Sequence, residues 1–195
     1  MTGFAEDPQS PFTTPMDKVS FLRWVETQEG RYELARGVVE MQARVTRGHA
    51  LVANAIAREL AKQLNTSEWT VLVEGFGVDV GDGVRYPDVL VERAGGDAAD
   101  LTTDKPIVIV EVLSPSSEDL HLQVKSREYT TLPALHAYLV ASQDTPRVWL
   151  WIRDPLTGRF QEEAAVLAGS DARIEIPELD LVIPLHEINR GLTAL

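Results

Sequence analysis

The chain has 195 residues, 44% of them hydrophobic, and no cysteine, which excludes disulfides, thiolate zinc sites and cysteine nucleophiles. Thirty acidic residues against eighteen lysines and arginines give a formal net charge of −12. This charge argues against non-specific DNA binding, whose affinity comes largely from neutralised phosphates, although it leaves room for a local basic groove.

Residues 1–13 are polar and interrupted by prolines, which predicts a disordered arm before a single domain over residues 14–195. This start lacks the basic residues and the apolar core of a signal peptide. No apolar run approaches the roughly 18 residues needed to cross a bilayer. We therefore expect a cytoplasmic protein without membrane contact.

The first elements have clear local signals. Thr14-Pro15-Met16-Asp17 predicts a helix start, with Thr14 as the hydroxyl cap and proline at the first helical position. Residues 32–34 and 38–41 predict a hairpin that turns through residues 35–37. A long helix is predicted over residues 46–64, where apolar residues recur every four positions.

In the middle of the chain the sequence predicts several strands and one helix. Residues 69–80 and 84–91 predict two strands joined at residues 81–83. Residues 106–113 are apolar on both faces, which is typical of a central, covered strand. The rest of the chain completes a single α/β domain. Its predicted elements are a polar loop over residues 93–104, a helix over 118–131, strands over 137–141 and 147–153, a turn over 154–158 and short strands ending near Pro184.

Two carboxylates occupy the edges of neighbouring predicted strands. Asp88 follows Tyr86-Pro87, and Glu111 closes the apolar run of residues 107–110. An aspartate after proline is often only a turn residue, whereas an acid that ends an apolar strand needs a partner or a metal. Two acids at adjacent strand ends are the minimal anchor for a hard divalent cation, which indicates metal-assisted phosphodiester chemistry.

The helix after Glu111 carries His121, Lys125 and Tyr129 at intervals of four, so they share one face. Lys125 could stabilise a pentavalent phosphate or orient a water, and Tyr129 could hydrogen-bond the lysine or the substrate. The alternative is an ordinary amphipathic helix with a solvated polar side. His49 lies on the apolar stripe of the long helix, where a packed side chain is more frequent than a contact near the mouth of a site.

Several motifs occur together in order along the chain. They are residues 31–41, Gly48-His49, Tyr86-Pro87-Asp88-Val89, Val110-Glu111-Val112-Leu113-Ser114-Pro115-Ser116 and Lys125-x-x-x-Tyr129. This combination resembles the Uma-type endonuclease family of the PD-(D/E)XK nuclease superfamily, over about residues 16–192. The resemblance implies a restriction-endonuclease-like α+β fold, a mixed β-sheet flanked by helices, and hydrolysis of nucleic-acid phosphodiester bonds.

The resemblance also implies roles for individual residues. Asp88, Glu111 and the Val112 carbonyl would hold Mg²⁺ or Mn²⁺, Glu33 would bind a second ion or a metal-bound water, and Lys125 would offset developing charge. DNA is the implied partner. Two departures stand out: Leu113 occupies the usual position of the superfamily lysine, and His121 stands where relatives commonly carry an acid.

Other functions are left open by the sequence. A catalytically inactive nuclease-fold interaction module is favoured by the acidity and by Leu113, and is opposed by the retained Glu33, Asp88, Glu111 and Lys125. Hydrolysis of a small phosphoester would tolerate the negative charge better than duplex binding. Trp149 and Trp151 share one face of a predicted strand and could pack in the core or anchor a homodimer.

Overall fold

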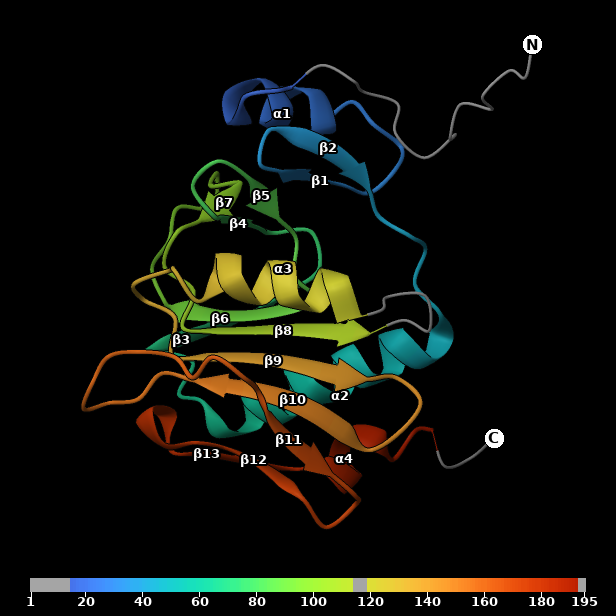
Figure 1. Cartoon of the computed structure of the whole chain (residues 1–195), viewed down its shortest axis with the longest axis vertical. Helices are drawn as coiled ribbons and strands as arrows, with labels where there is room; N and C mark the ends of the chain where they lie inside the picture. The colour runs from blue at the N-terminus through green and yellow to red at the C-terminus, as the bar shows by residue number, and fades with distance from the viewer. Residues whose placement is uncertain (1–14, 114–118, 193–195) are drawn as a thin grey trace.

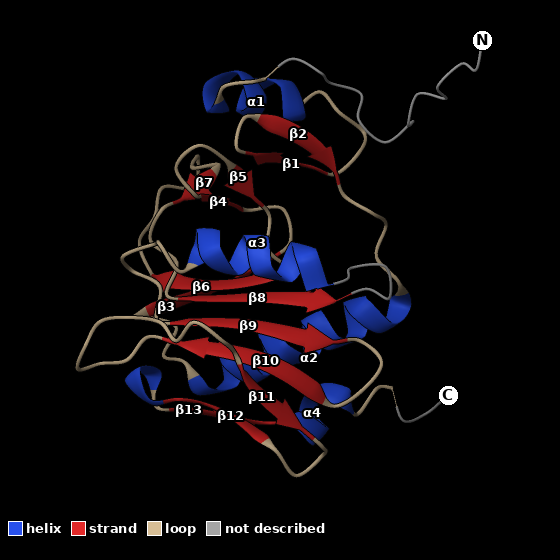
Figure 2. Ribbon diagram, viewed as in Figure 1, coloured by secondary structure: helices blue, strands red, loops and turns tan. Residues whose placement is uncertain are grey.

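The computed structural model describes residues 15–113 and 119–192, apart from the side chains of residues 119–123. A six-stranded mixed sheet forms the centre of the molecule, with α2 on one face and α3 on the other (Figures 1 and 2). The helices of the described residues are α1 (Lys18–Val25), α2 (Arg47–Gln63), α3 (Asp119–Tyr129) and α4 (Leu185–Asn189), together with the 3-10 helix η1 (Pro177–Leu179).

The strands within the described residues form three sheets. The large sheet has the order β11-β10-β9-β8-β6-β3, the small sheet has the order β2-β1-β5-β4-β7, and β12 pairs with β13. Large-sheet bounds are β3 (Trp69–Val73), β6 (Val89–Arg93), β8 (Val108–Leu113), β9 (Ala137–Ser142), β10 (Arg147–Ile152) and β11 (Ala165–Ala168). The others are β1 (Tyr32–Ala35), β2 (Val38–Met41), β4 (Gly77–Asp79), β5 (Val84–Arg85), β7 (Thr102–Thr103), β12 (Arg173–Ile176) and β13 (Leu181–Pro184).

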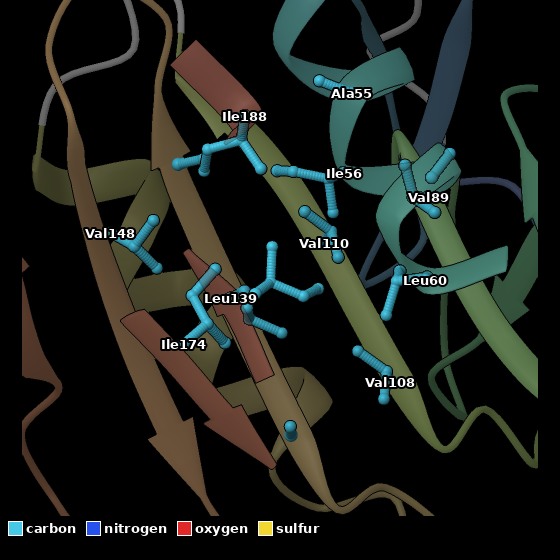
Figure 3. Close-up of a cluster of buried hydrophobic side chains, with 14 of the residues drawn as sticks. Ala55, Ile56, Leu60, Val89, Val108, Val110, Leu139, Val148, Ile174 and Ile188 are labelled. Atoms are coloured by element: carbon cyan, nitrogen blue, oxygen red, sulfur yellow. The ribbon is translucent and has the colours of Figure 1, made fainter. Parts of the chain in front are cut away.

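The central strand β8 is covered on both faces, as its sequence predicts. Val108 and Val110 pack with Ile56 of α2 in the larger core cluster (Figure 3). Ile109 points the other way, into the cluster that contains Tyr129 of α3. Each fully buried side chain of this kind stabilises the fold by about 1.5–3 kcal/mol. Since side chains alternate along a strand, the residue after Val110 faces α3.

The predicted hairpin and the predicted long helix are confirmed. β1 and β2 pair antiparallel around Arg36 and Gly37, whose φ angles of 49° and 80° are the two positive values that a type I′ turn requires. The Thr46 side chain accepts the His49 backbone N–H and caps α2 at its start, and the predicted last residue, Leu64, is its C-cap.

The predicted helix start at Thr14 is wrong. Helix α1 begins at Lys18, and its N-cap is Asp17, whose carboxylate accepts the Ser20 backbone N–H at 3.0 Å. An aspartate is at least as good a cap as a threonine, and here it stands directly before the apolar face of the helix. The predicted arm over residues 1–13 lies outside the described residues.

The two strands predicted over residues 69–80 and 84–91 are each broken in two. Glu74 and Gly75 have φ angles of 38° and 85°, so the chain turns between β3 and β4, and Pro87 separates β5 from β6. The outer pair, β3 with β6, belongs to the large sheet, whereas β4 and β5 pair in the small sheet. One hairpin therefore passes from one sheet to the other.

The remaining differences are small. The predicted loop 93–104 contains the two residues of β7, and the short helix α4 was not predicted. Trp151 is buried and stacks on Tyr138 with ring centroids 5.2 Å apart, so it packs in the core as the first of its two alternatives expects. In the described part of the chain, no helix is long and apolar enough to span a membrane.

Gly83→Ala is expected to lower the free energy of unfolding by about 1–3 kcal/mol. The added Cβ would lie 2.3 Å from the Leu34 carbonyl oxygen and would push β5 away from β1. Gly96→Ala is the matched control, because its Cβ would meet nothing closer than 3.7 Å. Urea denaturation measures both variants, and equal stability would contradict the close approach at Gly83.

Candidate active site

Asp88 lies at the point where β6 begins, directly beside β8. Val89 pairs with Val110, so the antiparallel register places Asp88 opposite Glu111. The Asp88 backbone N–H donates to the Val110 carbonyl at 3.1 Å, and its own Oδ2 accepts the Val112 N–H at 2.7 Å. The carboxylate thus replaces a backbone acceptor at the end of the ladder, which fixes the orientation of Asp88.

His49, in the first turn of α2, contacts the same carboxylate. Its Nε2 lies 2.8 Å from Asp88 Oδ1, and both side chains are buried. Because a carboxylate only accepts, Nε2–H is the donor in this contact, and Nδ1 is buried without a hydrogen-bond partner among the described residues. His49 is buried, as the packed-side-chain alternative expects, and it also contacts Asp88.

Glu111 faces α3 from β8 and accepts two hydrogen bonds from that helix. Lys125 Nζ and Tyr129 Oη each lie 2.9 Å from Oε1, because residues four apart on a helix point the same way. Tyr129 therefore donates to the glutamate, not to the lysine as one sequence alternative had it. Burial raises the pKa of Glu111, and the carboxylates of Glu33 and Asp88 add to the rise, while Lys125 opposes it.

Glu33 of β1 is 1% exposed and is the most completely buried acid of the site. Its Oε1 accepts from the Tyr86 N–H and from Lys125 Nζ, both at 3.1 Å. Its Oε2 accepts from Arg85 Nη1 at 3.0 Å and from Gln42 Nε2 at 3.1 Å. A carboxylate has about four acceptor positions, so Glu33 has none left for an ion.

The charges on Glu33 and Lys125 support one another. Burial alone would raise the pKa of Glu33, but Lys125 and Arg85 outweigh it and hold that pKa below its ordinary value of 4.5. Burial alone would likewise lower the pKa of Lys125, whereas Glu111 and Glu33 raise it well above its ordinary range. Both groups are charged at neutral pH. With a side chain only 14% exposed, Lys125 is not on a solvated helix face, so the amphipathic-helix alternative is wrong at this position.

Arg85 belongs to the same group of charges and was not predicted from the sequence. Its side chain is 3% exposed, and Nη1 contacts Glu33 at 3.0 Å and Glu40 at 3.2 Å. Its Nε and Nη2 donate to the two oxygens of Glu128 at 2.8 and 3.1 Å. One available signal was the position of Glu128, three residues after Lys125 and so on a neighbouring part of the same helix surface.

The four residues expected to form the site are therefore joined in one group. Lys125 Nζ bridges Glu33 of the small sheet and Glu111 of the large sheet, and Asp88 lies beside Glu111. Figure 2 shows α3 between the two sheets, where this bridge must lie. Arg85, Glu33, Lys125, Glu111 and Tyr129 are called the charge network below. The side chain of His121 lies outside the described residues, and Leu113 packs against an apolar cluster.

The donors present fit a divalent cation only in part. Asp88 and Glu111 offer hard oxygen ligands on opposed strand positions, and both described hydrogen bonds to Glu111 fall on Oε1. Within residues 15–113 and 119–192, no group of three or more His, Cys, Asp or Glu side chains is arranged to hold a metal ion. An ion here would have Asp88 and Glu111 as its carboxylate ligands and would need its remaining ligands from backbone and water.

The large mixed sheet with helices on both faces is a restriction-endonuclease-like fold. A crystal structure of a protein from Anabaena variabilis, described as "a putative nuclease belonging to DUF820", superposes on it with a TM-score of 0.76. That similarity covers 91% of this chain and 99% of the other at 16% sequence identity, so it shows the fold.

The family follows from the sequence match. The model of the Uma2 family, described as "Putative restriction endonuclease", matches residues 19–184, and the chain belongs to this family. A Synechocystis sp. protein described as "Uncharacterized protein" is 25% identical over 96% of this chain and 98% of its own length. The resemblance drawn from the motifs and the fold it implies are thus confirmed.

Glu33→Gln is expected to lower stability by roughly 3 kcal/mol at neutral pH, because it removes the buried anion between Arg85 and Lys125. Since the folded-state pKa of Glu33 lies below 4.5, the contribution of Glu33 is present above the unfolded-state pKa and is lost as the pH falls through the folded-state pKa. The deficit of the variant should therefore shrink only in acid.

Denaturant unfolding of the wild type and the Glu33→Gln variant, from neutral pH down to about pH 3, measures this difference. Glu40→Gln is the control, since Glu40 also contacts Arg85 but has a side chain that is 42% exposed. A deficit of constant size over the whole pH range would show that the charge of Glu33 is not what stabilises the fold.

Proposed function

We propose that this chain is a metal-dependent endonuclease that hydrolyses phosphodiester bonds of DNA. The observation that carries the proposal is the position of Lys125, whose ammonium lies 3.1 Å from Glu33 and 2.9 Å from Glu111, the residue opposite Asp88 in the strand register. The family description and the described nuclease with the same fold support it.

Lys125, on α3, supplies the positive charge at the site that the apolar Leu113, on β8, cannot supply. The two glutamates keep its ammonium charged and hold it in one place on rigid elements. A fixed positive charge stabilises the negative charge that develops on the phosphoryl oxygens, without reorganisation during the reaction. In this arrangement Glu33 positions the lysine and does not bind a second ion.

Asp88, Glu111 and the Val112 carbonyl would hold Mg²⁺ or Mn²⁺, which when bound polarises a phosphodiester oxygen and lowers the pKa of a coordinated water. The other residues orient these ligands. His49 and the Val112 N–H each donate to one oxygen of Asp88, and Tyr129 donates to Glu111. Burial raises the pKa of Tyr129 well above its ordinary range, so its phenol stays a donor.

Lys125→Ala should reduce DNA cleavage in Mg²⁺ or Mn²⁺ by on the order of 10²–10³-fold, because it removes the fixed charge at the phosphoryl group. Lys105→Ala, at an exposed loop position, is the matched control and should cleave like the wild type. The assay follows nicking of a supercoiled plasmid, with circular dichroism to confirm that the variant is folded.

Each other outcome of this assay points to a different function. Wild-type activity in Lys125→Ala would contradict the role of the lysine. DNA binding without cleavage would favour the interaction module, which the net charge of −12 and Leu113 also favour. Hydrolysis of bis(p-nitrophenyl) phosphate but not of DNA would favour a small phosphoester as substrate.

Mn²⁺ should raise the melting temperature of the wild type, because an ion that binds only the folded state stabilises it. At about a hundred times its dissociation constant the gain is about 2.7 kcal/mol. The double variant Asp88→Asn, Glu111→Gln should lose this response, whereas Asp97→Asn with Glu162→Gln, in exposed positions, should keep it. An equal shift in all three proteins would place the ion elsewhere on the acidic surface.

A further inference from the structure

The chain between β2 and α2 is an exposed segment anchored at both ends. We call residues 42–47, which include the first residue of α2, the linker. At its start, the Gln42 N–H donates to the Arg31 carbonyl at 2.8 Å. At its end, Thr46 Oγ1 donates to Gln143 Oε1 at 2.6 Å. The linker has no helical or strand structure before Arg47, and residues 43–47 are exposed. It is therefore a surface segment whose two ends are fixed by hydrogen bonds.

The linker runs past the candidate active site. Its first residue, Gln42, hydrogen-bonds Glu33 at 3.1 Å, and His49, two residues beyond its last, contacts Asp88 at 2.8 Å. Figure 1 shows this segment descending along the side of the molecule toward which β8 points. The acids of the site therefore flank the linker at both ends.

The charge of this part of the chain differs from that of the whole. Residues 31–47 contain four arginines and two glutamates, in a protein with a formal net charge of −12. Both glutamates, Glu33 and Glu40, accept from Arg85. Arg44 and Arg47 are exposed, and neither forms an ion pair with any residue that the structure describes. Two guanidinium groups next to the site are thus available to an anion.

We propose that the linker is the surface that binds the DNA backbone, with Arg44 and Arg47 contacting phosphates on either side of the bond to be cleaved. This inference rests on the proposed function. A planar guanidinium matches a phosphate with paired hydrogen bonds, and such contacts position a nucleic acid without reading its sequence. A local cationic segment also lets an acidic protein bind a polyanion at this one place.

The test is the salt dependence of DNA binding. Affinity for a short labelled duplex is measured by fluorescence anisotropy in a chelator, so that no hydrolysis competes, between about 50 and 200 mM salt. The double variant Arg44→Ala, Arg47→Ala should bind more weakly than the wild type. The slope of log K against log salt should become shallower by about 1.8, from about 0.9 for each lost phosphate contact.

The control is Arg159→Ala with Arg173→Ala, which removes the same charge from exposed positions in the C-terminal part of the chain. This variant should keep the slope of the wild type, and both double variants should keep its melting temperature. Equal slopes for the two double variants would overturn the linker as the binding surface. In that case, DNA cleavage by the wild type would still support the proposed function. A wild type that neither binds nor cleaves DNA would overturn both.

Discussion

The structure depends on the neutralisation of one buried carboxylate. Glu33 is 1% exposed, and an unpaired charge at such a position costs several kcal/mol. Arg85 and Lys125 supply the positive charges, and they come from different parts of the fold, β5 and α3. Because Lys125 also contacts Glu111, the same interaction joins the small sheet to the large one. The ion pairs that hold the two sheets together are therefore the same ion pairs that fix the geometry of the site.

The broken hairpin explains how neighbouring residues serve both sheets. Arg85 is the last residue of the small-sheet strand β5, and Asp88, three residues later, directly precedes the large-sheet strand β6. Pro87 cannot donate a backbone hydrogen bond, so the chain leaves one ladder and enters the next at this point. In between, the Tyr86 N–H donates to Glu33. Four consecutive residues thus connect the charge network to the Asp88 carboxylate.

Local patterns were enough to predict most of the fold. The hairpin over β1 and β2, the helix α2 and the covered strand β8 have periodicities that depend only on near neighbours. The break at Glu74 was not predictable in this way, because a strand has the same alternation in either sheet. The cap at Asp17 was missed since Thr14 matched the same signal.

The site residues were harder to predict from local sequence patterns than the fold was. Glu33, Asp88, Glu111 and Lys125 were selected from a resemblance to a family, and periodicity alone would have left Glu33 facing water. Arg85 was overlooked because its partners lie 52 and 43 residues away along the chain, and no pattern within a strand reports such a distance. The contact of Tyr129 with Glu111 similarly depends on the packing of α3 against β8.

The distance along the chain between the network partners also has a consequence for protein synthesis. Glu33 leaves the ribosome 52 residues before Arg85 and 92 residues before Lys125. Until both cations have emerged, the nascent hairpin of β1 and β2 carries an acid that it cannot bury without a large desolvation cost. The hairpin that is made early therefore cannot bury its acid at low cost until α3 has been made, and a truncated chain that ends before α3 lacks the ammonium that joins the two sheets.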